Sequence, residues 1–175
     1  MPTTEAHPIP IEAKSPIAPF QKSLQKYWQY YSDKGRNFHT KGMLKEASHY
    51  FLESVRVAQA LIFDDIHRNP DGKYSGIEML YIASHNLASC HNQQNDMAEG
   101  ELVLRTCHRE ISELAINKKH SKALRLESLC VLERSLFSLA SQLAFMNKPA
   151  QVHRLIDETG KVVDGLQQQL AISGI

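Results

Sequence analysis

The stretch 84-SHNLASCHNQQNDMAEGELVL-104 decides the fold, because the polar break Gln93-Gln94-Asn95-Asp96 separates two apolar patterns. Before the break, apolar and small residues recur every three or four positions from Ile77 to His91. After the break they recur in the same way from Met97 to Leu114. This spacing places the side chains on one face of a helix. The stretch therefore predicts two antiparallel helices joined by a tight turn.

The same pattern occurs on both sides of this hairpin. Helical apolar stripes flank Gly42, and others flank Asn147. The segments Asn69-Pro70-Asp71-Gly72 and Asn117-Lys118-Lys119-His120 separate the three pairs and are typical of turns and loops. No segment alternates with period two long enough to be a strand. We therefore predict an all-α chain of six helices, in three antiparallel hairpins over about residues 20–67, 75–116 and 121–172.

The hairpins also repeat one another around their turns. Gly42, Asn95 and Asn147 are spaced 53 and 52 residues apart. Residues of similar size recur at fixed offsets from these turns: Gly35, Ala88 and Ala140 seven before; Ala47, Gly100 and Val152 five after; Phe51, Leu104 and Ile156 nine after; Ser54, Cys107 and Thr159 twelve after. Small residues let crossing helices approach closely, and larger ones fill the space between them. We expect three structural repeats, with a plain six-helix bundle as the alternative.

This order of small, aromatic, turn, small, large and small residues resembles the tetratricopeptide repeat (TPR). The resemblance is carried in the first unit by Gly35, Phe38, Gly42, Ala47, Phe51 and Ser54. In the second unit, Asn86-Leu87-Ala88 and Asn95-Asp96-Met97-Ala98-Glu99-Gly100 are similar to a phrase of long-helix relatives, and the third unit, Leu136 to Thr159, matches in pattern. The TPR period is about 34 residues, so the helices and connecting loops are longer here. The resemblance covers about residues 28–165 and implies hairpins stacked as a right-handed superhelix.

A concave groove lined by the first helix of each hairpin is what the resemblance implies for binding. The residues it assigns to the groove are Ser32, Arg36 and His39, then His85, Asn86, Ser89 and Asn92, then Arg134 and Phe137, with Gln29, Thr40, Ile82, Gln93, Ser141 and Phe145 beside them. This set contains no acid, and it suits an extended peptide or an acidic chain end. Arg36, Asn86 and Arg134 partly match the clamp by which some family members hold a C-terminal carboxylate. Ser32 stands where that clamp has a lysine.

Signatures of catalysis and metal binding are missing from the sequence. It has no glycine-rich phosphate loop, no Gly-x-Ser-x-Gly and no His-Glu-x-x-His. Glu46-Ala47-Ser48-His49 is a single Glu-x-x-His, whereas a di-iron bundle needs two. His91 and Cys107 lie on the apolar faces of the middle hairpin, at heights about 12 Å apart, which is too far for one zinc ion. We therefore predict a non-enzymatic protein without cofactor or metal, in which His91 is a core histidine.

Composition limits the partners and the compartment. Of the 175 residues 42% are hydrophobic and 22% charged, and the formal net charge of +1 argues against a dedicated nucleic-acid binder. The basic cluster from Lys118 to Arg125 has no interleaved aromatic residues, so we interpret it as a solvated loop. The sequence shows no apolar run that could span a membrane and no signal peptide. Three cysteines, an odd number without a Cys-x-x-Cys pair, are typical of reduced thiols. We expect a cytoplasmic protein without membrane or nucleic-acid partners.

The first residues differ from the rest of the chain. Five of the seven prolines lie within residues 1–19 and exclude a helix before about Ser15. We expect an extended or disordered arm over residues 1–19, followed by one helical domain over residues 20–175. Ile9, Ile11 and Ile17 leave open that the arm packs on the folded part.

Three functions remain open from the sequence. The expected function is an adaptor that binds a peptide segment or an acidic chain end of a protein partner. The alternative is a self-assembling regulatory domain, such as a homodimer, whose groove holds its own arm, and a cofactor- or metal-binding bundle is the third. If the nine histidines titrate near pH 6.5, the net charge rises from +1 to about +10 on mild acidification. Binding of anionic peptides would then strengthen.

Overall fold

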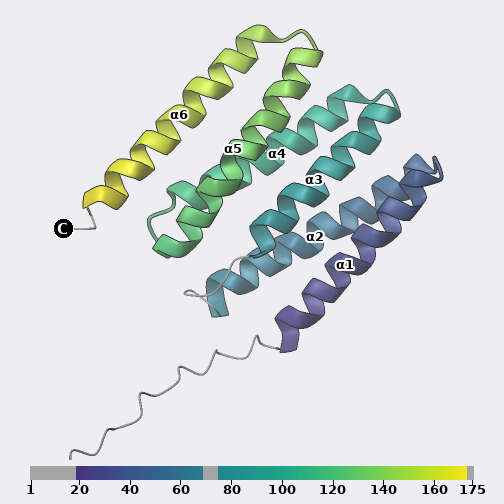
Figure 1. Cartoon of the computed structure of the whole chain (residues 1–175), viewed down its shortest axis with the longest axis horizontal. Helices are drawn as coiled ribbons and strands as arrows, with labels where there is room; N and C mark the ends of the chain where they lie inside the picture. The colour runs from purple at the N-terminus through teal and green to yellow at the C-terminus, as the bar shows by residue number, and fades with distance from the viewer. Residues whose placement is uncertain (1–18, 69–74, 173–175) are drawn as a thin grey trace, which may run out of the picture.

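The computed structural model describes residues 19–68 and 75–172, and these form six helices (Figure 1). The helices are α1 (Pro19–Thr40), α2 (Leu44–Arg68), α3 (Ser75–Gln93), α4 (Met97–Ile116), α5 (Lys122–Phe145) and α6 (Pro149–Ile172). The described residues contain no strand, so the predicted all-α class with three helical hairpins is confirmed. Pro19 already belongs to α1. Residues 1–18 of the predicted arm and the predicted turn at Asn69-Pro70-Asp71-Gly72 lie outside the described residues.

The turns inside the three hairpins have one geometry. Within the described residues, positive φ angles occur at Gly42 (73°), Asn95 (61°) and Asn147 (55°). Each of these residues donates its N–H to the carbonyl three residues back. The next residue donates five residues back, from Met43 to Phe38 (3.0 Å), Asp96 to His91 (2.9 Å) and Lys148 to Leu143 (2.9 Å). This is the Schellman ending of a helix, which glycine and asparagine adopt most easily. The three predicted turn positions are therefore confirmed.

The hairpins stack in chain order (Figure 1). Each helix packs against the next one along the chain. In addition, α3 contacts both α1 and α5, and α4 contacts α6. The first helices of the hairpins therefore form one layer, and their second helices lie beside it.

Two glycines lie where neighbouring helices are in close contact. A β-carbon added at Gly35 of α1 would lie 2.6 Å from Cε1 of Phe51 on α2. A β-carbon added at Gly100 of α4 would lie 2.3 Å from Oδ1 of Asn92 on α3. The sizes of these residues are therefore set by contact between helices, as the repeat pattern predicted for Gly35, Phe51 and Gly100.

The third hairpin departs from the predicted repeat at one position. Phe51 and Leu104 are buried, but Ile156 is 48% exposed, and its neighbour Leu155 is buried instead. The prediction of Ile156 as a residue that fills the helix interface is therefore wrong. The reason is that α6 is the last described helix, so no further helix covers its outer face.

One apolar core runs through five of the six helices. Its buried members are Trp28, Ala58, Ile62, Ile77, Leu80, Cys107, Ile111, Leu124, Val131 and Leu132. Val162 and Val163 of α6 pack against this cluster while remaining partly exposed. The hairpins therefore share a core, and their burial is expected to make them unfold cooperatively.

The three cysteines have different surroundings. Cys90 and Cys107 are buried, whereas Cys130 is exposed on α5. Burial raises the pKa of the Cys107 thiol to about 12. Burial also raises the pKa of the Cys90 thiol. At neutral pH both buried thiols are therefore protonated and unreactive.

A buried carboxylate joins the first three helices. Nε2 of Gln21 on α1 donates to Oδ1 of Asp65 on α2 over 2.7 Å. The backbone N–H of Gly76, at the start of α3, also donates to the Asp65 carboxylate. Burial and the neighbouring Asp64 carboxylate nevertheless raise the pKa of Asp65 to about 6.

A buried histidine joins the last three helices. Nδ1 of His108 on α4 lies 2.8 Å from Oγ of Ser135 on α5, and Nε2 lies 3.0 Å from Oγ1 of Thr159 on α6. Burial lowers the pKa of His108 to about 4, so the ring is neutral at pH 7. The predicted core histidine, His91, is only partly buried. The prediction named the wrong histidine, because α4 is covered by α3 on one side and by α5 and α6 on the other, so its buried face is wider than one stripe.

Candidate functional site

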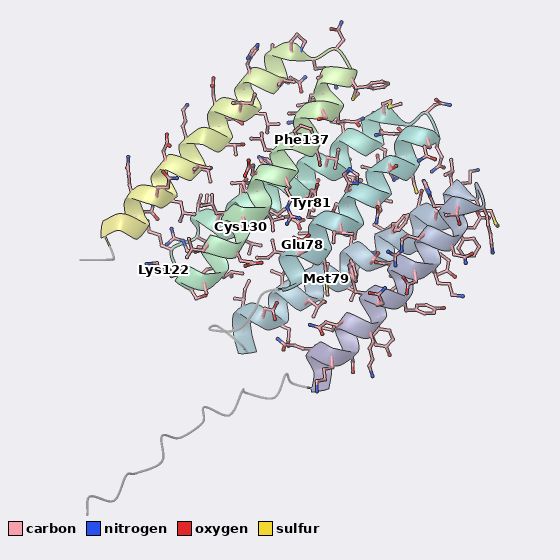
Figure 2. All side chains as sticks on the ribbon, viewed as in Figure 1. Glu78, Met79, Tyr81, Lys122, Cys130 and Phe137 are labelled. Carbon is pink, nitrogen blue, oxygen red and sulfur yellow. The ribbon has the colours of Figure 1, made fainter. Side chains whose placement is uncertain are left out.

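A groove lies between α3 and α5, with a cavity volume of about 540 Å³. We call it the α3–α5 groove. Its lining residues are Tyr81, His85, Ala88, Ser89, Asn92, Gln93, Met97, Leu104, Phe137, Ser138, Ser141, Gln142 and Phe145. Figure 2 shows two of them, Tyr81 on α3 and Phe137 on α5, on the face of the stack turned toward the viewer. The groove therefore lies between the first helices of the second and third hairpins, where the resemblance implied binding.

Aromatic rings give the groove its apolar surface. Phe137 and Phe145 are 74% and 75% exposed, although they are large and apolar. They are eight residues apart on α5 and so lie on the same side of the helix. The ring of Tyr81 faces them from α3, and its hydroxyl lies 3.2 Å from Oγ of Ser138. Exposed aromatic side chains around a hollow are typical of binding surfaces.

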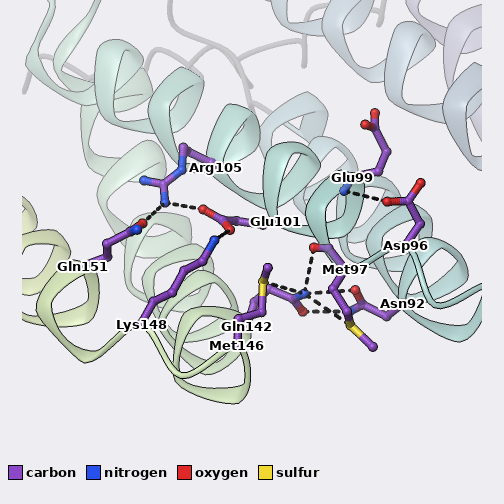
Figure 3. Close-up of polar contacts among 10 residues, drawn as sticks. All are labelled: Asn92, Asp96, Met97, Glu99, Glu101, Arg105, Gln142, Met146, Lys148 and Gln151. Atoms are coloured by element: carbon purple, nitrogen blue, oxygen red, sulfur yellow. Dashed lines mark hydrogen bonds and ion pairs between the residues drawn. The ribbon is translucent and has the colours of Figure 1, made fainter.

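A pair of amides closes the end of the groove near the turns (Figure 3). Nδ2 of Asn92 donates to Oε1 of Gln142 over 2.7 Å, and Nε2 of Gln142 donates back to Oδ1 of Asn92 over 3.0 Å. The Gln142 amide also contacts the carbonyl oxygen and the sulfur of Met97, at 3.3 and 3.8 Å. These contacts fix α3 against α5, so this end of the groove is rigid and its amides are already hydrogen-bonded.

Arg134 of α5 does not line the groove and is already paired with an acid. Nη1 of Arg134 donates to Oε1 of Glu78 over 2.8 Å, and Nη2 donates to Oε2. The guanidinium also lies over the Tyr81 ring, 5.1 Å from its centroid. The hydrogen bonds that the guanidinium donates to Glu78 raise the pKa of Arg134. Arg134 was predicted to bind a ligand carboxylate in a groove without acids, but Glu78 of this chain occupies that position.

The groove residues predicted on α1 are not part of the α3–α5 groove. Ser32 is 3% exposed, so it offers no surface to a ligand. Arg36 pairs with Asp33 one turn away, and hydrogen bonds from Gln29 and Arg36 lower the pKa of that carboxyl. Assigning Ser32 and Arg36 to an acid-free groove was therefore wrong, because one faces the core and the other is paired with an acid.

His39 and Asn86 also lie away from the lining. Nε2 of His39, on the last turn of α1, is 2.8 Å from Nε2 of Gln93, which itself lines the α3–α5 groove. Asn86 is partly exposed on α3 and does not line the groove. The structure therefore brings together His85, Ser89, Asn92 and Phe137 of the assigned residues, with Gln93, Ser141 and Phe145 of those placed beside them.

Six residues of the lining were missed by the sequence analysis: Tyr81, Ala88, Met97, Leu104, Ser138 and Gln142. Among them, Tyr81 on α3 contacts Ser138 on α5, and Gln142 on α5 is hydrogen-bonded to Asn92 on α3. Gln142 is 7% exposed and interrupts an apolar part of α5 between Leu139 and Leu143. An amide at such a position needs a buried partner, so it could have indicated a contact between helices.

No metal site is found in the part of the chain that the structure describes. Residues 19–68 and 75–172 contain no group of three or more His, Cys, Asp or Glu side chains placed to hold a metal ion. No described helix is both long and apolar enough to cross a membrane. Neither observation identifies a function.

Comparison with known proteins adds one family. The model of the family described as "Protein of unknown function (DUF2753)" matches residues 26–172, which include almost all of the helical stack. No curated protein matches the chain.

Proposed function

Because the chain belongs to the DUF2753 family, which has no known function, we propose a function from the groove itself: a non-enzymatic adaptor that binds a segment of a protein partner. The observation that carries the proposal is the α3–α5 groove with two largely exposed phenylalanines. Its volume of about 540 Å³ admits several side chains of a short segment. Ser89, Ser141 and His85 supply polar groups beside the rings.

The repeated turns support the TPR-like part of this proposal. The three hairpins each have a left-handed residue at the same position of the turn, and they stack in chain order. Helical-repeat adaptors have this arrangement. In this proposal the stack is a right-handed superhelix, and its first helices form the binding surface.

An apolar or aromatic segment fits the groove better than an acidic chain end. The charges of Arg134 and Arg36 are neutralised by Glu78 and Asp33, so a ligand carboxylate would have to displace an existing partner. The exposed rings need no such exchange.

The test is affinity capture from the native cell with the full-length protein and a double variant, Phe137→Ser with Phe145→Ser. Both side chains are exposed, so the fold should remain, as circular dichroism would verify. Tyr27→Ser is the matched control, since Tyr27 is a 58% exposed aromatic residue on α1 that does not line the α3–α5 groove. The proposal expects a partner that the control retains and the double variant loses, and it fails if both proteins capture the same set.

The same experiment addresses the alternative in which the arm fills the groove. A protein lacking residues 1–18 would then bind more partner than the full chain does. Its oligomeric state, measured as the mass in solution, would also differ from that of the full chain. If the shortened protein captured the same amount of partner and had the same oligomeric state, that alternative would be rejected.

A further inference from the structure

A second groove lies between α2 and α4, and it is formed by a different face of α3. It consists of two hollows of about 300 and 320 Å³, which we call the Leu52 hollow and the Phe63 hollow after a residue in each. Leu80 of α3 lines both hollows. We call the pair the α2–α4 groove. None of its lining residues lines the α3–α5 groove.

The two hollows are separated by a polar bridge. Nε2 of Gln59 on α2 lies 3.1 Å from both Oε1 and Oε2 of Glu110 on α4. Gln59 and Glu110 line both hollows. The groove therefore has an apolar hollow on each side of one polar crossing point.

The hollows repeat after seven residues on both helices. On α2, the Leu52 hollow is lined by Leu52, Val55, Arg56 and Gln59, and the Phe63 hollow by Gln59, Ile62, Phe63 and Ile66. On α4, Val103, Thr106, Cys107 and Glu110 line the first hollow, and Glu110, Glu113, Leu114 and Asn117 line the second. Seven residues correspond to about 10 Å along a helix. Side chains seven residues apart on a third helix would be spaced to enter both hollows.

Apolar side chains at the hollows remain exposed to solvent. Phe63 is 64% exposed and Leu102, which lines the Leu52 hollow, is 54% exposed. Each hollow therefore offers a large apolar side chain that a docked helix would cover.

The charges around the groove are mostly acidic. The carboxylates are Glu99, Glu110 and Glu113. Arg56 is the arginine of the lining, and it pairs with Glu53 over 2.5 Å. Arg109 lies 3.8 Å from Glu113, where both side chains are about two-thirds exposed and solvent screens the pair. Burial and the nearby Arg125 lower the pKa of His120, so this lining residue adds no positive charge at pH 7.

We propose that the α2–α4 groove binds an amphipathic helix of a partner protein, with two apolar side chains seven residues apart and lysine or arginine beside them. The apolar side chains fill the two hollows, and the basic residues face Glu99, Glu110 and Glu113. This surface is separate from the α3–α5 groove, so the two proposals stand or fall independently.

The experiment selects peptides with the full-length protein. A displayed library of 18-residue helical peptides carries leucine at two positions seven apart, and its flanking positions vary between lysine and glutamate. We expect enrichment of lysine at the flanking positions. We also expect at least a threefold loss of affinity for the selected peptides between 50 and 300 mM salt, because exposed charges are screened. Selection of glutamate, or no enrichment, would overturn the proposal.

Two groove variants and two matched controls locate the binding. Phe63→Ser with Leu102→Ser should lower the affinity for the selected peptides at least tenfold. Glu99→Lys with Glu113→Lys should lower it at least threefold. Tyr27→Ser with Ile156→Ser is the apolar control, and Glu133→Lys with Asp157→Lys repeats the charge change on exposed residues elsewhere. Equal binding by groove variants and controls would reject the site.

The same proteins distinguish a partner helix from a second copy of the chain. If the groove pairs with another copy, the wild-type mass in solution would exceed that of a monomer, and Phe63→Ser with Leu102→Ser would restore the monomer mass. That outcome would overturn the proposal of a partner helix. A monomeric wild type that binds the basic peptides supports it.

Discussion

The two ends of the helical stack share a backbone plan and differ in the polar group that each buries. At the N-terminal end, Asp65 joins α1, α2 and α3 through Gln21 and Gly76. At the C-terminal end, His108 joins α4, α5 and α6 through Ser135 and Thr159. The turns have the same geometry at both ends, although the buried polar contacts between the helices differ. The turn therefore fixes how each helix pair is connected, and it does not fix which side chains pair between the helices. Because burial raises the pKa of Asp65 and lowers that of His108, the two ends should respond to pH in opposite directions.

Removing the aromatic ring at the N-terminal interface should have the largest effect. Phe51→Ala deletes a 2% exposed side chain that contacts Gly35, and it should cost about 3–5 kcal/mol of unfolding free energy. The equivalent residue of the third unit, Ile156, is 48% exposed, and Ile156→Ala should cost less than about 1 kcal/mol. Urea unfolding measures both. Equal losses would mean that the two ends are packed alike.

Removing the buried histidine should have the next largest effect. His108→Ala leaves two buried hydroxyls without their imidazole and should cost about 2–4 kcal/mol at pH 7.5. The unfolded histidine gains its proton near pH 6.5, whereas the folded one does so near pH 4. The contribution of His108 is therefore complete above about pH 6.5 and is lost as the pH falls toward 4. The variant should lose this pH dependence.

Unfolding at pH 7.5 and at pH 5 tests the histidine prediction. His91→Ala is the matched control, because His91 is partly exposed and lies on the same hairpin. A loss for His91→Ala as large as that for His108→Ala would contradict the placement of the core histidine.

The smallest predicted effect has the opposite sign. Asp65 has a folded pKa of about 6, above its usual value of 3.8, so protonation favours the folded state. The contribution of Asp65 to stability is therefore complete below about pH 3.8 and is lost as the pH rises through 6. Asp65→Asn removes the charge and should stabilise the protein by about 1–3 kcal/mol at pH 8, with little change at pH 4. Asp157→Asn on the exposed side of α6 is the control, and a destabilised Asp65→Asn protein would show that the charged form is the favoured one.

The helices and their turns could be predicted from the sequence because both are local. Helix stripes depend on residues three or four apart, and the left-handed turns at Gly42, Asn95 and Asn147 depend on the residue itself and its nearest neighbours. These local signals do not indicate how many other helices cover a given helix. The exposed Ile156 and the buried His108 follow from that covering, whereas the local pattern placed Ile156 in an interface and indicated His91 as the core histidine.

The candidate site was predictable only in part for the same reason. The positions of His85, Ser89, Asn92 and Phe137 follow from helix phase, and these residues line the α3–α5 groove. The partner of Arg134 is Glu78, 56 residues away, and no local pattern indicates that pair. The position of Ser32 along its helix predicted that it would face the groove, but the packing of the helices buries it in the core.

The unequal burial of the cysteines gives the protein the chemistry of a single thiol. Cys90 and Cys107 are shielded and protonated at neutral pH, which leaves Cys130 as the accessible sulfhydryl of the chain. Cys130 lies on α5 seven residues before Phe137, about 10 Å along the helix (Figure 2). A maleimide fluorophore would therefore label one defined position near the α3–α5 groove without mutagenesis. Its emission would report directly on what enters that groove.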